Sequence, residues 1–307
     1  KQSTEFTGLA LTALDIDLGR WIGEKVNEFI QDNSLNIDII ASHGHTVFHQ
    51  TEKGITRQIG DGNVIAAVTG KTTIYDFRSF DVALGGQGAP LVPIGDRLLF
   101  HEFDYCLNLG GIANISFESD GQRFAFDICP CNMTLNHLAK RIHQDFDKDG
   151  EIAQKGITIT SLLKKLDDLD FYTHSYPKSL GYEWVRDNIF PLIEEGVDST
   201  ENLMRTLADH TVNQITKAII PLNGTGKKLL VTGGGAFNLY IIEQVRNKLS
   251  PEVEVYIPEK DLINYKEAIV FGFLGVLRAR SEINCLSSVT GAQYDNSGGV
   301  IAGPFTV

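Results

Sequence analysis

The chain has 307 residues, a length that suggests about two domains with ample buried core. It carries 27 Lys and Arg against 39 Asp and Glu, a formal net charge of −12, and no basic run, which disfavours a nucleic-acid-binding surface. Four cysteines without a CxxC pair argue against a disulfide scaffold, and no secretory signal pattern opens the chain, so a cytoplasmic protein is expected.

The first third of the chain is expected to start with a helix and continue with short strands. Apolar residues at intervals of three and four predict a helix over 9–30. A continuous apolar run over 37–41 predicts a strand that is buried on both faces. A second short strand is predicted over 73–77, followed by a polar, glycine-rich loop over 85–90.

The rest of the chain predicts an antiparallel start and then strands that alternate with helices. Residues 105–116 have a hairpin pattern with Gly110 and Gly111 at the turn. Further strands are predicted over 124–127, 228–232 and 253–257, and helices over 133–146, 200–220, 236–249 and 265–280. This order indicates an α/β fold. Domains are expected over 1–104 and 105–307, with the helix at 265–280 packing back on the first domain.

Two glycine-rich turns follow predicted strands, one around Gly110 and one over 233–235. Glycines let backbone N–H groups approach phosphates closely, and the second turn leads into the positive end of a helix. Either turn alone is better explained as a tight turn without a ligand. Together they favour a nucleotide site between two domains, in which glycine-lined bends from separate halves of the molecule meet over a triphosphate.

Two charged residues could carry chemistry, and each has a structural alternative. Asp127 ends a predicted strand, where a carboxylate can accept a proton as a general base, or can equally cap the following helix. Arg78 can grip a substrate carboxylate with two parallel hydrogen bonds. An ion pair with Asp76 or Asp81 explains Arg78 about as well.

The histidines at 43, 45 and 49 follow a strand, and on a strand His43 and His45 would share a face. This pattern permits a metal-dependent hydrolase that uses His43 and His45 as ligands. The further ligands that such a site needs are not apparent, so histidines satisfied by backbone partners are favoured and no metal-ligand residue is assigned.

Nine stretches of the sequence resemble, in family order, those of the anhydro-N-acetylmuramic acid kinases. They are residues 42–46, 76–78, 81–93, 108–114, 126–127, 147–150, 177–179, 231–235 and 288–292. The stretch over 85–93 is the most specific. The resemblance implies a two-domain actin-like ATPase fold, which is ribonuclease H-like, with ATP and sugar enclosed in an inter-domain cleft.

The resemblance also implies an activity. Kinases of this family use ATP and water to open the ring of 1,6-anhydro-N-acetylmuramic acid and phosphorylate O6. The product is N-acetylmuramic acid 6-phosphate, in the recycling of cell-wall peptidoglycan. ATP and Mg²⁺ are the implied cofactors, with magnesium bridging the phosphates. The expected partners are the amino sugar and ATP, with neither nucleic acid nor membrane, and a homodimer stays open.

By the same resemblance, Asp127 would be the general base that activates water against the anomeric carbon while O6 attacks the γ-phosphate. The residues implied to hold the sugar and its lactyl carboxylate are His43, Arg78, Gly86, Gln87, Ala89 and Pro90. Those implied to hold the nucleotide are Gly110, Gly111, Asn132, Gly233, Gly234 and Gly235.

Three features depart from the family pattern. No stretch matches the strand and Gly-Thr-Ser-x-Asp-Gly loop with which the family begins, and we expect that segment to precede Lys1. Cys129 and Cys131 stand where the family's Asp-Thr-Gly-Pro-Gly-Asn motif has glycines, and His45 stands where the family usually has Gln. A catalytically impaired sugar- or nucleotide-binding protein of the same fold is therefore an alternative.

Overall fold

The computed structural model describes residues 6–195, 198–219 and 226–304, and the chain divides into two compact units. Unit 1 consists of Lys1–Leu98 and Glu267–Val307, and unit 2 of Leu99–Lys266. The C-terminal residues thus group with the N-terminal part of the chain, whereas the sequence predicts a second domain over 105–307 from which only the helix at 265–280 packs back on the first. No helix among the described residues is both long and apolar enough to cross a bilayer.

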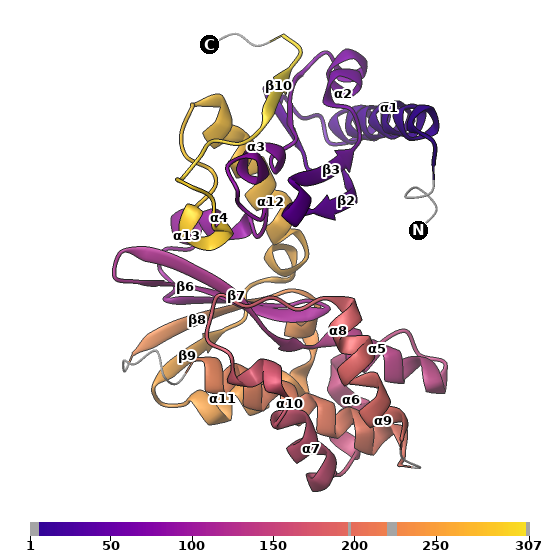
Figure 1. The fold of residues 1–307 in the computed structure, drawn as a ribbon, viewed down its shortest axis with the longest axis vertical. Coiled ribbons are helices and arrows are strands. Elements are labelled where there is room, and N and C mark those ends of the chain that lie inside the picture. Colours follow the sequence, from indigo (N-terminus) through magenta and orange to yellow (C-terminus); the bar gives the residue numbers. More distant parts are fainter. Residues whose placement is uncertain (1–5, 196–197, 220–225, 305–307) are drawn as a thin grey trace. The chain divides into compact units, whose positions relative to one another are not determined.

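Unit 1 contains two small sheets and a set of mostly short helices (Figure 1). Its strands are β1 (Ile39–Ser42), β2 (His45–Gln50), β3 (Ile55–Ile59), β4 (Thr72–Tyr75) and β10 (Val300–Ala302). Its helices are α1 (Gly8–Asp32), α2 (Gly62–Thr69), α3 (Ser79–Ala83), α4 (Val92–Leu99), α13 (Ser287–Thr290) and the short 3₁₀ turn η2 (Thr51–Lys53), and it shares α12 (Lys260–Ala279) with unit 2.

The main sheet of unit 1 has the order β1-β4-β10. The strand β1 runs parallel to β4, whereas β10 pairs with β4 antiparallel and sets Ile301 opposite Ile74. This pairing explains why the C-terminal segment belongs to unit 1. The predicted strands over 37–41 and 73–77 are confirmed as β1 and β4, with ends that differ by one or two residues.

The predicted helix over 9–30 is confirmed as α1, which packs closely on α2. A Cβ atom on Gly19 would lie 2.8 Å from the Asp61 carbonyl oxygen, and one on Gly23 would lie 2.9 Å from the Val68 Cβ. The two glycines therefore permit this close helix contact, because any larger side chain would push the helices apart.

Unit 2 is built on one sheet with the order β7-β6-β5-β8-β9. The strands are β5 (Tyr105–Leu109), β6 (Ile112–Ser119), β7 (Gln122–Pro130), β8 (Lys227–Thr232) and β9 (Val253–Tyr256). The strands β5, β6 and β7 form an antiparallel meander, while β5, β8 and β9 run parallel. The predicted hairpin around Gly110 and the predicted α/β class are both confirmed.

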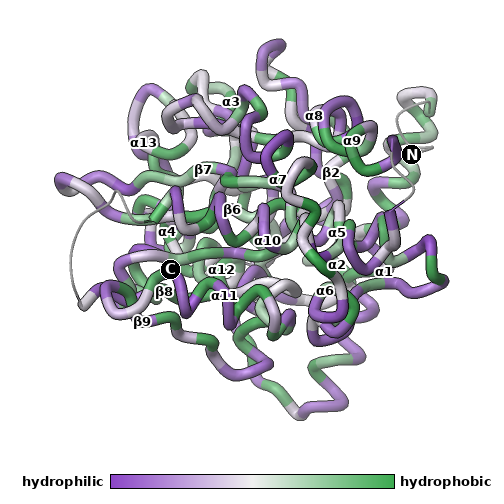
Figure 2. The backbone as a smooth tube through the Cα atoms, turned by 90° about the horizontal axis from the view of Figure 1, so that it is seen from below, coloured by the Kyte–Doolittle hydropathy of each residue, from purple (hydrophilic) through white to green (hydrophobic). Residues whose placement is uncertain are grey.

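In Figure 1, α10 and α11 lie together below the strands of this sheet, in contact with β7 and β9 respectively. Hydrophobic residues run through the strands and hydrophilic ones mark the turns (Figure 2). The helices are α5 (Asn132–Ala139), α6 (Glu151–Lys155), α7 (Thr160–Asp167), α8 (Tyr182–Asn188), α9 (Phe190–Glu194), α10 (Thr200–Ile219) and α11 (Leu239–Leu249). Short 3₁₀ turns are η3 (Lys140–Ile142), η4 (Lys148–Gly150), η5 (Asp170–Thr173) and η7 (Gly234–Phe237).

Three predicted helix boundaries differ from the structure. The helix expected over 133–146 ends at Ala139, because η3 follows and His143 takes a left-handed conformation. The helix expected from 236 begins at Leu239, where the Asn238 side chain caps it by accepting from the Ile241 N–H. The last long helix begins at Lys260 rather than 265. Residue 220, at the end of the helix expected over 200–220, lies outside the described residues.

Candidate active site

The two glycine-rich turns lie at the carboxyl ends of neighbouring parallel strands in unit 2. The strands β5 and β8 pair so that Asn108, the next-to-last residue of β5, lies opposite Thr232, the last residue of β8. A Cβ on Gly233 would lie 2.6 Å from Asn108 Oδ1, so the turns are in close contact. Ligands of open α/β sheets bind at such strand ends. The expectation that the two bends come from separate halves of the molecule is wrong, because both belong to one unit.

Asn132 ties the first turn to the start of α5 and reaches towards the second turn. Its side-chain amide donates to the Leu109 carbonyl at 3.0 Å, and its backbone N–H donates to the Gly110 carbonyl at 3.1 Å. A Cβ on Gly235 would lie 2.6 Å from the Leu109 Cβ and 3.4 Å from Asn132 Nδ2. The structure thus brings together the residues predicted to hold the nucleotide, which are Gly110, Gly111, Asn132, Gly233, Gly234 and Gly235.

Cys129 and Cys131 replace family glycines, but their thiols do not cover this surface. Both residues are 0 % exposed and belong to the hydrophobic core of unit 2. Burial raises the pKa of both thiols, that of Cys131 to about 12, so neither is a thiolate nucleophile. Cys131 has a negative φ of −127°, so it does not take the left-handed conformation that favours glycine.

Asp127 lies on β7 opposite Asn114, in the same unit as the glycine turns. Its carboxylate oxygen Oδ2 accepts from the Leu180 N–H at 2.8 Å and from the Ser179 hydroxyl at 3.3 Å. Its own N–H donates to the Lys178 carbonyl at 3.0 Å. The helix-cap interpretation is wrong, because β7 continues to Pro130 and the residue that precedes α5 is Cys131.

The electrostatic setting of Asp127 suits a proton acceptor. Burial raises the pKa of the carboxyl group, while the bonds from Leu180 and Ser179 limit that rise. A carboxylate with a raised pKa is a stronger base than an exposed one. The bonds to Leu180 and Ser179 both end on Oδ2, so the structure orients the group through one of its two oxygens.

In unit 1, Arg78 joins two of the predicted sugar-binding elements. Its Nε donates to His43 Nε2 at 2.9 Å and its Nη1 donates to the Gly88 carbonyl at 2.5 Å. His43 Nδ1 lies 3.0 Å from the Gly44 carbonyl. Because Nε2 accepts from a guanidinium, Nδ1 must carry the proton, and burial followed by the charge of Arg78 lowers the pKa of His43. His43 is therefore neutral at pH 7.

The carboxylates that could have paired with Arg78 have other partners. Asp76 Oδ1 accepts from the Ser79 backbone and hydroxyl. Asp81 is 0 % exposed; its Oδ2 accepts from the Gly88 N–H at 2.8 Å. Arg78 donates to His43 and Gly88 instead, so these two aspartates do not compensate the charge of its guanidinium group.

Asp81 is a site residue whose role the sequence does not reveal. Its Oδ1 accepts from three side chains of the C-terminal segment, namely Cys285 (3.0 Å), Thr290 (2.8 Å) and Asn296 (2.9 Å). A Cβ on Gly86 would collide with Asp81 Oδ2. The carboxylate thus fixes the glycine-rich loop against residues more than 200 positions away. Asp81 lies in a stretch that resembles the family, and that resemblance is the only feature of the sequence that points to a role in shaping the loop.

The rest of the loop is held by backbone and side-chain bonds. The Gln87 N–H donates to the Thr290 carbonyl at 2.8 Å, and Gln87 Oε1 accepts from the Thr51 hydroxyl at 2.6 Å. Gly88 has a φ of +63°, which favours glycine. The loop continues directly into Ala89 and Pro90, so the structure gathers His43, Arg78 and residues 86–90 in unit 1.

A metal-dependent hydrolase is not supported. No group of three His, Cys, Asp or Glu side chains in the described part of the chain could hold a metal ion. His43 Nε2 already accepts from Arg78, while His45 and His49 are exposed on β2. His45, which replaces the family's usual Gln, is paired in the β2–β3 hairpin opposite Ile59.

Comparison with known proteins identifies the family. A family model described as "Anhydro-N-acetylmuramic acid kinase" matches residues 2–304. The anhydro-N-acetylmuramic acid kinase of Vibrio cholerae is 36% identical over 319 residues, covering 97% of this chain and 84% of the relative. That of Aliivibrio fischeri is 38% identical over 282 residues, covering 87% of this chain and 76% of the relative. The chain therefore belongs to the anhydro-N-acetylmuramic acid kinase family of sugar kinases.

Proposed function

We propose that this protein uses ATP and water to convert 1,6-anhydro-N-acetylmuramic acid into N-acetylmuramic acid 6-phosphate. Family membership supports the reaction class. The single observation in the structure that supports it best is the placement of Asp127. A half-buried, oriented carboxylate lies in the same unit as two contacting glycine turns, which can hold a triphosphate.

The proposed reaction couples ring opening to phosphoryl transfer. Asp127 takes a proton from water, whose oxygen attacks C1 of the sugar. The C1–O6 bond breaks, and O6 uses the released electron pair to attack the γ-phosphorus of ATP. The bond between the γ-phosphorus and the bridging oxygen then breaks, and ADP leaves with that electron pair. Every bond that forms is thus matched by one that breaks.

The nucleotide-binding residues supply backbone N–H groups rather than charged side chains. Gly110, Gly111 and the turn over 233–235 allow close approach of phosphate oxygens, and Asn132 stabilises the arrangement through Leu109. This donor set fits Mg²⁺ held mainly by the phosphates themselves, as is usual for kinases. Magnesium bound there would offset the negative charge that develops during phosphoryl transfer.

The sugar-binding role falls to unit 1. Arg78 is a guanidinium with a planar set of donors, of which Nε donates to His43 and Nη1 to Gly88. Such a group suits the lactyl carboxylate of a muramic acid. The backbone of Gly86, Gln87, Ala89 and Pro90 would supply the neutral hydrogen bonds that sugar hydroxyls and the acetamido group require. His43, whose two ring nitrogens are engaged with Arg78 and Gly44, would hold the guanidinium in place beside the sugar.

The proposed function also bears on where the protein is located. A kinase that consumes ATP is expected in the cytoplasm, where ATP is available. The homodimer stays a prediction, which the molar mass of the protein in solution can check.

The test is release of ADP with defined sugars. Purified protein with ATP and Mg²⁺ is expected to release ADP when 1,6-anhydro-N-acetylmuramic acid is added, with N-acetylmuramic acid 6-phosphate as product. A control, 1,6-anhydro-N-acetylglucosamine, lacks the lactyl carboxylate and should react far more slowly. No sugar-dependent release of ADP, or ATP and sugar binding without turnover, would reject the kinase and favour the impaired binding protein.

A further inference from the structure

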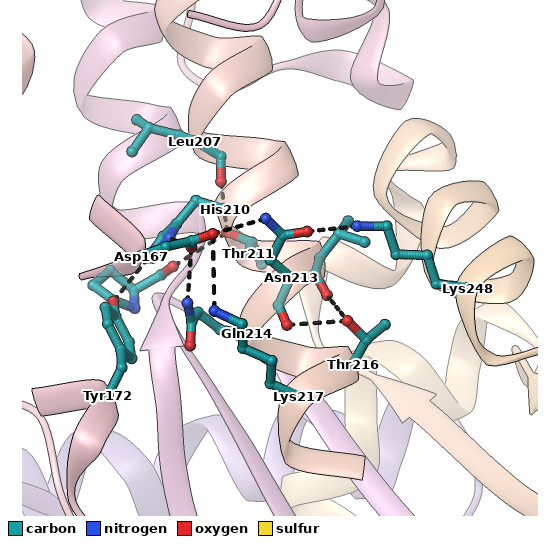
Figure 3. Close-up of polar contacts among 12 residues, drawn as sticks. Asp167, Tyr172, Leu207, His210, Thr211, Asn213, Gln214, Thr216, Lys217 and Lys248 are labelled. Atoms are coloured by element: carbon teal, nitrogen blue, oxygen red, sulfur yellow. Dashed lines mark hydrogen bonds and ion pairs between the residues drawn. The ribbon is translucent and has the colours of Figure 1, made fainter. Parts of the chain in front are cut away.

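A polar cluster in unit 2 joins α7, η5 and α10, and the proposed reaction does not use it (Figure 3). His210 of α10 is 1 % exposed; its Nδ1 lies 2.6 Å from Asp167 Oδ1 at the end of α7. Its Nε2 lies 2.9 Å from the Tyr172 hydroxyl in η5. Asp167 also accepts from the side-chain amides of Asn213 and Gln214. We call these five residues the His210 cluster.

The protonation of the cluster is determined by its partners. Although burial opposes it, the bonds from His210, Asn213 and Gln214 lower the pKa of Asp167 to about 2, so Asp167 is a carboxylate. A carboxylate only accepts, and His210 Nδ1 must therefore donate to it. Burial lowers the pKa of His210, so its Nε2 is unprotonated at neutral pH and accepts from the Tyr172 hydroxyl.

The direction of these bonds gives Tyr172 one defined position. Its hydroxyl donates to Nε2 of the buried His210, and the bond to Asp167 prevents that imidazole from flipping. Tyr172 also packs edge-on against Phe171 and Trp184. The turn η5 is therefore anchored on α10 by one directed hydrogen bond and on α8 by the packing of Tyr172 against Trp184.

The turn η5 in turn contacts the segment that holds Asp127. Lys178 Nζ donates to the Phe171 carbonyl at 3.3 Å, and its ammonium group lies 4.6 Å from the centre of the Phe171 ring. The Lys178 carbonyl accepts the Asp127 N–H at 3.0 Å. The next two residues, Ser179 and Leu180, donate to the Asp127 carboxylate. A continuous set of contacts thus leads from His210 to Asp127.

We propose that Tyr172, held by His210 and Asp167, is a positioning residue that fixes the segment 178–180 and through it the orientation of the Asp127 carboxylate. The proposal rests on the proposed function only in taking Asp127 as the general base. Tyr172 itself does not contact the carboxylate. Its effect passes through Phe171 and Lys178, so its loss is expected to change the geometry of the base and leave nucleotide binding intact.

The alternative is that the His210 cluster only fastens α7 to α10. The chain offers a matched control for this. Tyr240 donates its hydroxyl to Asp209, which is also on α10, and Asp209 accepts from Thr158 and Arg205 as well. Tyr240→Phe removes the same atom from a comparable buried network that has no path to residues 178–180 among these contacts. Tyr172→Phe and Tyr240→Phe should therefore have similar costs in stability.

The experiment measures hydrogen exchange and kinetics on the full-length protein in parallel. In Tyr172→Phe, the Asp127 and Leu180 amides should exchange about tenfold faster than in the wild type. The kcat for the anhydro sugar should fall about tenfold with the KM for ATP unchanged. Tyr240→Phe should show neither change. Equal behaviour of the two variants, or wild-type exchange at Leu180 in Tyr172→Phe, would overturn the proposal.

A second variant tests the same contacts in case Tyr172→Phe does not fold. A second measurement distinguishes failure of the positioning role from failure of the proposed function. Lys178→Met breaks the contact with Phe171 without altering the His210 cluster, and it should reproduce the faster exchange at Leu180. Wild-type exchange at that amide in this variant would equally overturn the positioning role. The proposed function is rejected if the wild-type protein releases no ADP with the anhydro sugar. Exchange at the Leu180 amide tests the positioning contacts and requires no turnover, so the two proposals can fail independently.

Discussion

At the scale of single residues, Arg78 distinguishes sugar binding from nucleotide binding. The guanidinium is joined to His43 and Gly88 in unit 1, whereas the glycine turns belong to unit 2. Arg78→Ala is expected to raise the KM for the anhydro sugar at least tenfold, since a charge-assisted bond to a carboxylate contributes about 1.5–3 kcal/mol. The KM for ATP should stay within about twofold. Equal losses for both substrates in steady-state kinetics would indicate a structural role instead.

Asp81 tests whether the shape of the glycine-rich loop determines sugar affinity. Asp81→Asn keeps the volume but replaces one acceptor oxygen by a donor, so either the Gly88 N–H at Oδ2 or the Thr290 hydroxyl at Oδ1 loses its acceptor. The KM for the sugar is expected to rise several-fold more than the KM for ATP.

Asp15→Asn is the matched control for Asp81→Asn. Asp15 is also buried in unit 1, where it accepts from the Gly60 N–H at 2.7 Å and from Arg57, but it does not contact the loop. Thermal unfolding should show that both variants lose stability. A sugar KM that rises equally in both would contradict the specific role of Asp81.

The difference between Asp127 and Asp81 shows what could be predicted from the sequence. Asp127 could be predicted as a candidate base because the sequence pattern places a carboxylate near the end of a strand, although β7 continues to Pro130. The role of Asp81 could not, because its partners Thr290 and Asn296 are more than 200 residues away and only the fold brings them together. The bonds from Ser179 and Leu180 to Asp127 could not be predicted for the same reason, although residues 177–179 belong to a stretch that resembles the family.

At the scale of secondary-structure elements, the turn between β5 and β6 is predicted to face the nucleotide. A Cβ on Gly111 would have its nearest neighbours at 3.7 and 3.8 Å, both in Met133, which is ordinary contact. Gly111→Ala should therefore fold with an unchanged melting temperature. If phosphate oxygens approach this backbone, the added methyl group should weaken ATP binding about tenfold, as measured by calorimetry. Unchanged affinity would place the phosphates elsewhere.

Elements with strong local patterns could be predicted, and those fixed by tertiary contacts could not. The long periodic runs of α1 and α10 and the apolar run of β8 are recovered nearly in full. The hairpin β2–β3 was missed because its exposed, mixed sequence has no clear alternation. Strand β10 is three residues long and exists because β4 offers it a pairing edge.

At the scale of the whole molecule, two buried neutral histidines are expected to make stability depend on pH. Burial is the main cause that lowers the pKa of both His43 and His210 in the folded protein. In the unfolded chain these two histidines take up protons near pH 6.5, whereas in the folded chain they become protonated only at a lower pH. The unfolded state therefore binds more protons in this window, and the free energy of unfolding should fall as the pH drops below 6.5.

Urea unfolding between pH 7 and pH 5 measures this dependence. A fully buried histidine that stays neutral contributes a slope of at most about 1.4 kcal/mol per pH unit. His210→Gln should remove that part of the slope, whatever its effect on stability at pH 7. His174→Gln is the control for replacing an exposed histidine by glutamine. An unchanged slope in His210→Gln would show that His210 is protonated in the folded protein.

The account depends most on Asp127 as the base that activates water, and Asp127→Asn tests it most directly. The amide keeps the size of the side chain but cannot accept the proton, and a general base contributes about 10²–10⁴-fold to rate. Release of ADP with 1,6-anhydro-N-acetylmuramic acid should fall by that factor, while calorimetry shows nearly wild-type affinity for ATP. Ordinary turnover by Asp127→Asn would contradict the account.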